Sequence, residues 1–597
     1  MNRNMMKRNV PLDKNEPHPK GGLSALVRFC KPYFPAIAVA LVCAVGGTIF
    51  TIIGPDKLSE LTDVISAGLM GGIDMAAVTR IAITLAVMYG LSFLLSAVQG
   101  QLMTGVTQKA SRQLRESISK KVNRLPIDYY NKTTFGDILS RVTNDVDLIG
   151  QTIQSSIITF VSAVVTLVGC LVMMFVTNWV MTLSAIAATL LGFLLITLIT
   201  SRSQKYFVAR QQELGEINGH IEEAYSGHTV LRVYNAEKQF SETFETLNEK
   251  LYNASWKSQF LSGLMMPVMN FVGNLGYVTV CVVGALLALN GNITFGVIVA
   301  FIVYVRLFTS PLSQIAQALT SLQSASAAAG RVFEFLEAEE MEDESGKTKT
   351  LLNPTGQVTF SHVKFGYTPE RMIIKDFNLE VKPGQKVAIV GPTGAGKTTL
   401  VNLLMRFYEL NGGSISMDGV NLHDITRENV HDLFGMVLQD TWLFEGTIRE
   451  NLCYGKAGIT DGQLDRACKA VGLLHFIRAL PHGYDTVLDA SVSLSEGQKQ
   501  LLTIARAMIE DAPMLILDEA TSSVDTRTEI LIQKAMDELT RGRTSFVIAH
   551  RLSTIKNADI ILVLRDGDVV ESGSHEELLA KGGFYAELYN AQFSDAA

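Results

Sequence analysis

One short segment of the chain has the residue types and the spacing that hold the phosphates of a nucleoside triphosphate. It fits the pattern G-x-x-x-x-G-K-[ST] directly after the apolar run Lys386–Val390. Glycines let the backbone turn tightly and aim N–H groups at phosphate oxygens, and the lysine supplies a positive charge. The following hydroxyl can ligate Mg²⁺. We therefore expect a nucleoside triphosphate and Mg²⁺ to bind at Gly391, Pro392, Thr393, Gly394, Ala395, Gly396, Lys397, Thr398 and Thr399, with Thr398 as a metal ligand.

Two acidic residues follow a second strand-like run. Asp518 and Glu519 come directly after the apolar residues Met514–Leu517. Functional side chains in α/β domains gather at the carboxyl ends of parallel strands. We expect Asp518 to hold Mg²⁺ through water and Glu519 to orient or polarise the water that attacks the γ-phosphate. Alone, such a pair is weak evidence, and its position after the phosphate loop supports this interpretation.

A third segment, Leu494–Gln498, precedes the helical stretch Leu501–Ile509. It places a serine, a glycine and free backbone N–H groups at a helix N-terminus, where a second anion can bind. As chemistry alone it could also be a simple helix cap. With this segment, the chain from about residue 25 to residue 590 resembles one half of an ATP-binding-cassette (ABC) exporter of the multidrug type.

The resemblance implies roles for several further residues. Tyr367 would stack on adenine, Gln439 would ligate Mg²⁺ and couple the γ-phosphate to the membrane domain, and His550 would contact the γ-phosphate. Each of these three ends or follows a strand-like run. Asp525, in the segment Ser522–Asp525, occupies the position of the family's D-loop.

The resemblance also implies a dimer. Ser495, Gly497 and Gln498 of one chain would contact ATP held by the phosphate loop of a second chain. Glu496 stands where the family usually has a glycine, and an extra carboxylate beside ATP is unfavourable unless it is paired or points away. The segment Leu494–Gln498 corresponds to the family's signature, and an intact catalytic glutamate such as Glu519 together with a deviant signature resembles one subunit of heterodimeric bacterial exporters. We therefore predict a heterodimer, with a homodimer as the alternative.

The composition indicates a membrane protein. The chain has 597 residues, of which 48% are hydrophobic and only 18% are charged. A net charge of −7 argues against a broadly basic nucleic-acid binder. The six cysteines lack the spacing of a metal site or a disulfide framework.

Six apolar segments are long enough to cross a bilayer. They lie at about residues 33–53, 81–102, 153–176, 179–200, 264–289 and 297–319. Basic residues crowd the leader and the segment after the second span, which places the N-terminus and the nucleotide-binding domain in the cytoplasm. We expect Asp56–Ala76 to be an outer loop and the long inner connections to be helical. Segments Asp128–Leu139 and Ile221–Val230 resemble the family's coupling helices.

These elements define the expected architecture. A cytoplasmic leader (1–24) precedes an all-α membrane domain of six transmembrane helices with long cytoplasmic extensions (25–336). A solvated acidic linker (337–356) then leads to an α/β P-loop nucleotide-binding domain of the ABC type (357–597). The expected location is a bacterial cell membrane, because the leader does not resemble a transit peptide.

The transported substrate is the open question. We expect export of amphipathic drugs or toxins by alternating access, with a lipid or peptide exporter as one alternative and an ATP-gated channel or regulator as another. Arg306 lies inside the sixth span, where an ionisable residue faces either a cavity or a structural partner. The fifth span carries Met265, Met266, Met269, Phe271 and Tyr277, which suit adaptable apolar ligands but serve more often in helix packing.

Overall fold

The structure is a computed structural model of the chain. It describes residues 22–69, 72–352, 354–368, 371–439, 441–488, 494–518, 525–548 and 555–593. These residues form two compact units. The membrane unit contains the described residues up to Arg124 together with Thr133–Ala338, and the cassette unit contains Leu125–Lys132 and the described residues from Glu339 onward.

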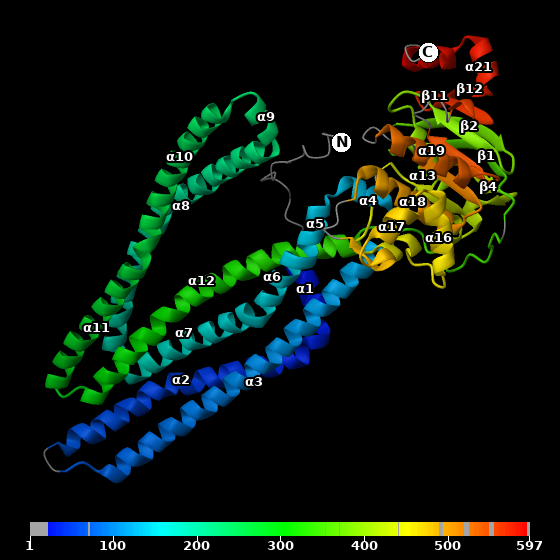
Figure 1. Cartoon of the computed structure of the whole chain (residues 1–597). Helices are drawn as coiled ribbons and strands as arrows, with labels where there is room; N and C mark the ends of the chain where they lie inside the picture. The colour runs from blue at the N-terminus through cyan, green and yellow to red at the C-terminus, as the bar shows by residue number, and fades with distance from the viewer. Residues whose placement is uncertain are drawn as a thin grey trace. The chain divides into compact units, whose positions relative to one another are not determined.

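The membrane unit is entirely helical in its described part (Figure 1). Six of its helical stretches are long and apolar enough to cross a membrane, which confirms the prediction of six spans. Helices α2, α3, α7 and α12 run together, and α8 packs with α10 and α11. The α-helices are α1 (Gly22–Cys30), α2 (Phe34–Gly68), α3 (Met75–Val122), α5 (Phe135–Ser140), α6 (Val146–Gln151), α7 (Ile157–Thr177), α8 (Trp179–Ser226), α9 (His228–Val233), α10 (Glu237–Gly263), α11 (Met265–Leu289) and α12 (Phe295–Glu337).

The expectation of a loop over Asp56–Ala76 was wrong for most of its length. Helix α2 continues through Pro55 as far as Gly68. A proline inside a helix removes one backbone hydrogen bond, but the helix is not interrupted here. Beyond Pro55, the carboxylate of Asp63 accepts hydrogen bonds from the Gly296 N–H (2.8 Å) and the Thr294 hydroxyl (2.7 Å). The extension of α2 therefore caps the start of α12.

The long connections between the spans are helical, as predicted. Helices α3, α8 and α12 extend well beyond their apolar segments, and α10 directly precedes the fifth span, which lies in α11. Between α8 and α10, the short helix is α9, so it begins later than the predicted segment Ile221–Val230, whose first residues still belong to α8. The end of α12 is tied to the region before α7 by an ion pair in which Arg331 Nε lies 3.0 Å from Asp145 Oδ2.

The cassette unit is an α/β structure with two main sheets (Figure 1). A mostly parallel sheet has the order β12-β11-β3-β10-β9-β6, and an antiparallel sheet has the order β2-β1-β4-β5. The strands are β1 (Val358–Phe365), β2 (Ile374–Val381), β3 (Lys386–Val390), β4 (Gly412–Met417), β5 (Val420–Asn421), β6 (Phe434–Val437), β7 (Gly446–Thr447), β8 (Val487–Leu488), β9 (Met514–Asp518), β10 (Thr544–Ile548), β11 (Ile560–Arg565) and β12 (Asp568–Gly573).

Helices cover the sheet and place its two faces in separate apolar cores. Ile516 and Phe546 belong to one core, and Leu517 and Val547 belong to the other, because successive side chains on a strand point to opposite faces. The α-helices of the unit include α4 (Ile127–Lys132), α13 (Lys397–Leu404), α14 (Arg427–Asp432), α15 (Ile448–Cys453), α16 (Asp461–Ala470), α17 (Leu474–Ala479), α18 (Glu496–Glu510), α19 (Thr526–Thr540), α21 (His575–Lys581) and α22 (Phe584–Phe593).

The acidic stretch after α12 is docked rather than solvated at its centre, which corrects the expectation for this part of the linker. Glu344 lies 3.0 Å from Lys347 Nζ, 2.8 Å from Arg406 Nη1 and 3.0 Å from Arg427 Nη1, and only 15% of its side chain is exposed. Arg406 is itself buried and follows α13. We call these four residues the linker clasp. Complementary charges, which the sequence pattern did not reveal, hold the linker on the cassette.

Candidate functional site

The phosphate loop connects β3 to α13 and needs glycine at three positions. Gly391, Gly394 and Gly396 have φ values of +155°, +86° and +100°, a region that other residues rarely adopt. A Cβ atom on Gly391 would also lie 2.4 Å from the Leu564 carbonyl oxygen. The backbone therefore turns out of the sheet without side chains that would block a phosphate, which fits the predicted ATP site.

Lys397 begins α13 and folds back over the loop. Its ammonium group donates to the carbonyl oxygens of Gly391 (2.8 Å) and Pro392 (3.2 Å). Burial lowers the pKa of Lys397, and the negative charge of Asp518 opposes that shift. The lysine is thus held at the loop by weak carbonyl acceptors, which the oxygens of a phosphate can replace with stronger, charge-assisted bonds.

The neighbouring strands bring the other predicted residues to the same edge of the sheet. In the parallel register, Ile389 of β3 pairs with Ile548 of β10, and Ile548 pairs with Asp518 at the end of β9. Val437 of β6 pairs with Leu517, so the exposed Gln439 follows two residues beyond this edge. Thr398 is exposed on the first turn of α13, so Thr398 and Asp518 offer the oxygen ligands that Mg²⁺ prefers.

Some predicted residues lie outside the described part of the chain. They are Glu519, which directly follows β9, His550, which follows β10 by two positions, and Ser522–Val524. Asp525 is described and caps α19, because its carboxylate accepts hydrogen bonds from the N–H groups of Arg527 (3.1 Å) and Thr528 (3.0 Å). A hydrogen bond from the Thr528 side chain, together with those from the two backbone N–H groups, lowers the pKa of Asp525. The aspartate of the predicted D-loop therefore also fixes the start of a helix.

Tyr367 lies beside the phosphate loop. Its hydroxyl is 3.2 Å from the hydroxyl of Thr399 on α13, and its side chain is 41% exposed. Its ring makes edge contacts with the rings of Phe365 and Tyr408, at centroid-to-centroid distances of 5.0 Å and 5.1 Å. An exposed aromatic ring held next to the loop is a suitable platform for a nucleotide base.

Sequence reasoning missed Tyr408, whose ring makes an edge contact with Tyr367 and whose hydroxyl accepts a hydrogen bond from the Asn131 side chain of α4 (2.6 Å). Tyr408 is far from Tyr367 in sequence and belongs to no recognisable pattern, so only the fold reveals the contact. Through Tyr408, the predicted adenine platform is connected to α4, the first part of the predicted coupling segment Asp128–Leu139.

The segment Leu494–Gln498 forms a complete helix cap at the start of α18. The Ser495 hydroxyl accepts from the Gln498 N–H (3.2 Å), and the Gln498 side chain accepts from the Ser495 N–H (2.9 Å). Gly497 is buried in the first turn. Glu496 is 59% exposed and is paired with Lys499 (2.8 Å), a spacing that the sequence could have revealed.

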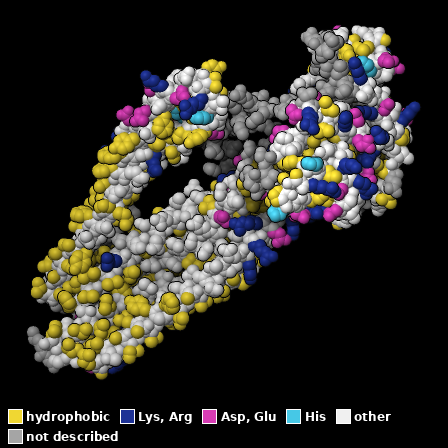
Figure 2. Space-filling view, in the orientation of Figure 1, with side chains coloured by type: hydrophobic (Ala, Val, Ile, Leu, Met, Phe, Trp, Pro, Cys, Tyr) yellow, Lys and Arg dark blue, Asp and Glu magenta, His cyan; other side chains and the backbone are white. Residues whose placement is uncertain are grey.

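Arg306 is exposed within the span formed by α12, and no acidic side chain among the described residues pairs with it. Further along the same helix, a cavity of about 310 Å³ lies between α8, α11 and α12. Met265 and Met269 line this cavity, whereas Met266, Phe271 and Tyr277 are exposed elsewhere on α11. Hydrophobic side chains dominate the surface at the end of the membrane unit that lies away from α9 (Figure 2).

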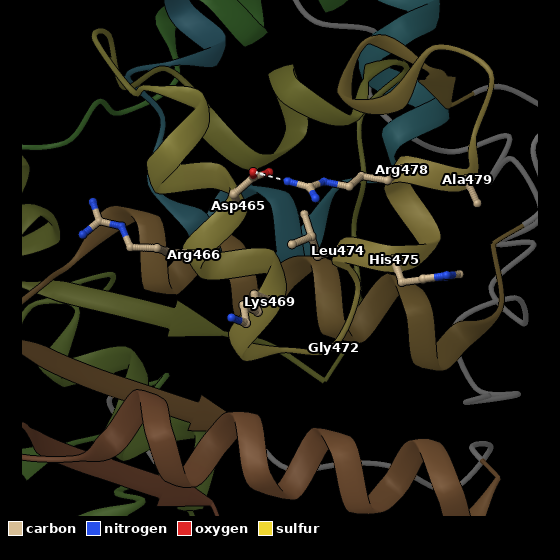
Figure 3. A pocket seen from close by; sticks show the side chains of 8 residues that line it. All are labelled: Asp465, Arg466, Lys469, Gly472, Leu474, His475, Arg478 and Ala479. Carbon is tan, nitrogen blue, oxygen red and sulfur yellow. Dashed lines mark hydrogen bonds and ion pairs between the residues drawn. The ribbon is translucent and has the colours of Figure 1, made fainter.

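A larger hollow of about 760 Å³ lies on α16 and α17 of the cassette unit, apart from the phosphate loop. It is lined by Asp465, Arg466, Lys469, Gly472, Leu474, His475, Arg478 and Ala479. Asp465 pairs with Arg478 (2.6 Å), while Arg466 and His475 point in opposite directions (Figure 3). Because its basic side chains diverge, this open hollow does not form a converging binding site.

Two parts of the chain match families of known proteins. The family described as ABC transporter transmembrane region matches residues 37–312, and the family described as ABC transporter matches residues 374–522. An uncharacterized ABC transporter ATP-binding protein of Bacillus subtilis (strain 168) is 39% identical over 596 residues, which is 98% of each chain.

Two other relatives have names that state a substrate. A fatty acid ABC transporter ATP-binding/permease protein of Mycobacterium bovis is 46% identical over 521 residues, covering 87% of this chain and 82% of its own. An ATP-dependent lipid A-core flippase of Desulfotalea psychrophila is 36% identical over 492 residues, covering 82% of this chain and 86% of its own. Since these matches extend over both units, the chain belongs to the ABC transporter family, as an exporter half-transporter that joins six membrane helices to one ATP-binding cassette.

Proposed function

We propose that this ABC exporter moves amphipathic, lipid-like small molecules out across a bacterial cell membrane. The observation that carries the proposal is the mostly apolar cavity between α8, α11 and α12, in the same chain as the phosphate loop. The names of the relatives from Mycobacterium bovis and Desulfotalea psychrophila support a lipid-like substrate over a drug. The N-terminus and the cassette would face the cytoplasm, where ATP is available.

ATP would bind with its phosphates on the loop Gly391–Thr398 and its base on Tyr367. Lys397 would exchange its carbonyl partners for phosphate oxygens, because a charge-assisted hydrogen bond is stronger than a neutral one. Thr398, Gln439 and Asp518 would hold Mg²⁺, which neutralises charge on the phosphates during transfer. Glu519 would orient the attacking water, and His550 would contact the γ-phosphate.

Replacing Glu519 by glutamine tests the assignment of the catalytic carboxylate. The substitution keeps the shape of the side chain but removes its ability to accept a proton. We expect kcat for ATP hydrolysis to fall on the order of 10²- to 10⁴-fold, while the affinity for ATP stays within a few fold. The exposed variant Glu538→Gln is a matched control. Rapid hydrolysis by the Glu519→Gln protein would show that another group activates the water.

Transport would require a dimer of cassettes. In this arrangement the start of α18, with Ser495, Gly497 and Gln498, would face the ATP on the phosphate loop of a second chain. ATP binding would favour the closed pair of cassettes and hydrolysis would release it, because the γ-phosphate bridges the two chains only while it is present. Opening and closing of the cassettes would drive alternating access of the membrane unit.

The heterodimer stays a prediction. The pairing of Glu496 with Lys499 offsets the added negative charge, so the charge alone does not disable this signature. The bulk of the glutamate side chain, however, still stands at the helix N-terminus where the family usually has a glycine. This steric obstruction by Glu496 supports a partner chain that carries a glycine at the equivalent position.

Proteoliposomes test the proposed export. The chain, with its partner if one co-purifies, is reconstituted with cassettes outward and supplied with Mg²⁺ and ATP. We expect ATP-dependent accumulation of a fluorescent fatty acid inside the vesicles, and no accumulation with the Glu519→Gln variant. Accumulation of a cationic dye but no fatty acid would favour drug export. Ion current without accumulation of any amphiphile would favour the channel.

A further inference from the structure

The membrane unit contains a cavity of about 310 Å³ whose walls come from three helices. Small-molecule sites in proteins span about 300–1,000 Å³, so this cavity has room for one slender ligand and not for a lipid with several acyl chains. The residues that line it are Thr189, Gly192 and Ile196 of α8, Met265, Met269, Val272 and Gly273 of α11, and Thr309, Leu312, Ser313, Ala316 and Gln317 of α12. The methionines give the apolar wall an adaptable shape.

One side of α12 is polar along this cavity and also beyond its lining, at Arg306. Ser313 and Gln317 follow Arg306 by seven and eleven residues, a spacing that places all three on one side of a helix. Thr309 lies on the same side, although its hydroxyl is bonded to the carbonyl oxygens of Val305 (3.2 Å) and Arg306 (3.3 Å). In the described part of the chain, neither Ser313 nor Gln317 makes an intramolecular side-chain hydrogen bond. We call Arg306, Thr309, Ser313 and Gln317 the polar stripe.

Arg306 is the only charged residue of this stripe, and it lies deep in the span. It follows the start of α12 at Phe295 by eleven residues, or about 16 Å of helix, which is near the middle of a hydrocarbon core of about 30 Å. A charge at this depth is costly unless it meets an opposite charge or water. No carboxylate among the described residues pairs with Arg306, so an anionic ligand would satisfy it.

We propose that the cavity and the polar stripe form a binding site for a single-chain amphiphile with an anionic head. The apolar chain lies against Met265, Met269 and Val272, and the carboxylate or phosphate of the head lies on the stripe at Arg306. The charge of Arg306 disfavours cationic drugs, and the size of the cavity favours a ligand with one acyl chain over a lipid with several. This inference rests on the proposed function, since it names the substrate class of the same exporter.

Variants at Arg306 and Gly273 test the charged part and the apolar part of the site separately. Arg306→Gln removes the charge, and Arg306→Lys keeps it. Gly273→Leu fills the cavity, because a Cβ atom at Gly273 meets no other atom within 4 Å and the helix need not shift. Gly90→Leu on α3 is a matched control: a Cβ atom there is equally free, and Gly90 does not line the cavity. Arg80→Gln, also on α3, is the control for loss of charge.

Binding is measured on the purified full chain in nanodiscs with three radiolabelled probes: dodecanoate, dodecyl phosphate and the neutral methyl dodecanoate. We expect Arg306→Gln to weaken binding of the anionic probes on the order of tenfold or more and to leave the ester unaffected. Arg306→Lys keeps most of the affinity, and Gly273→Leu abolishes binding of all three. Whichever anionic probe binds more tightly identifies the head group.

The proposal is overturned if the anionic probes bind no better than the ester, or if Gly273→Leu binds like Gly90→Leu. Failure of the binding-site proposal can be distinguished from failure of the proposed export. Binding as expected without ATP-driven accumulation in proteoliposomes would refute export but not the site. Accumulation of dodecanoate by both the wild type and Gly273→Leu would support export and refute the site.

Discussion

At the scale of single residues, Lys397 is held by the phosphate loop in a position where its positive charge can bind a phosphate. Its ammonium group is buried and rests on two carbonyl oxygens of the loop. We expect Lys397→Ala to weaken ATP binding about 10- to 100-fold, because a hydrogen bond to a charged group contributes about 1.5–3 kcal/mol. Equilibrium binding of a fluorescent ATP analogue measures the effect. Lys382→Ala, on the exposed surface, is the control, and equal affinities in the two variants would contradict the assigned role.

Residues in short patterns could be predicted from the sequence, and residues that act through tertiary contacts could not. Gly391 and Lys397 belong to a pattern in which each residue type has one physical reason. Tyr408 contacts Tyr367, although the two residues are 41 positions apart in the sequence, and no local sequence pattern around either residue predicts this contact. The order of the motifs along the chain identified the strands, but their register, which brings Asp518 level with Ile548, came only from the structure.

At the scale of elements, contacts of charged side chains decided two features that hydropathy did not reveal. Asp63 lies in the extension of α2 beyond Pro55, and its carboxylate caps the start of α12. Glu344 turns the acidic linker into a docked segment, because Arg406 and Arg427 approach it from two sides. The apolar pattern correctly predicted the six spans, whose length is set by the bilayer. It could not predict where polar side chains extend or anchor a segment.

The linker clasp gives a prediction about pH. Burial raises the pKa of Glu344, but hydrogen bonds from the Arg427 N–H and Lys347 and the charges of Arg427 and Arg406 outweigh it, so the pKa lies below its ordinary value of about 4.5. The ionised glutamate therefore stabilises the fold above that pH, and the stabilisation is lost as the pH falls through the lowered pKa. We expect Glu344→Gln to cost about 1–3 kcal/mol near pH 7.

Thermal unfolding of the full chain in detergent measures this effect. The difference in Tm between the wild type and Glu344→Gln should be largest near neutral pH and should shrink as the pH falls below about 4.5. Glu428→Gln, on the exposed face of α14, controls for the loss of a surface charge. A difference in Tm that does not change with pH would mean that the side chain contributes by packing and not by its charge.

At the scale of the whole molecule, the proposed dimer gives the start of α18 a function. The cassette holds a phosphate loop and a capped signature helix on separate elements, and the hydrogen bonds of Ser495 and Gln498 are satisfied locally. These bonds hold the first turn of α18 in a capped conformation. A second cassette would bring its phosphate loop to this helix N-terminus, where the helix dipole favours an anion.

The identity of that second cassette can be tested on the chain alone. If Glu496 obstructs the signature through its bulk, the purified chain will have low ATPase activity as a homodimer, and Glu496→Gly will raise kcat at least about tenfold, since a barrier of about 1.4 kcal/mol corresponds to a factor of ten. Lys499→Ala separates bulk from charge, because it leaves the carboxylate unpaired and should lower activity further. Robust, amphiphile-stimulated hydrolysis by the unmodified chain, with no gain from Glu496→Gly, would establish a working homodimer and refute the heterodimer. The ATPase of the three proteins, measured at equal ATP occupancy, therefore decides which kind of partner completes the site.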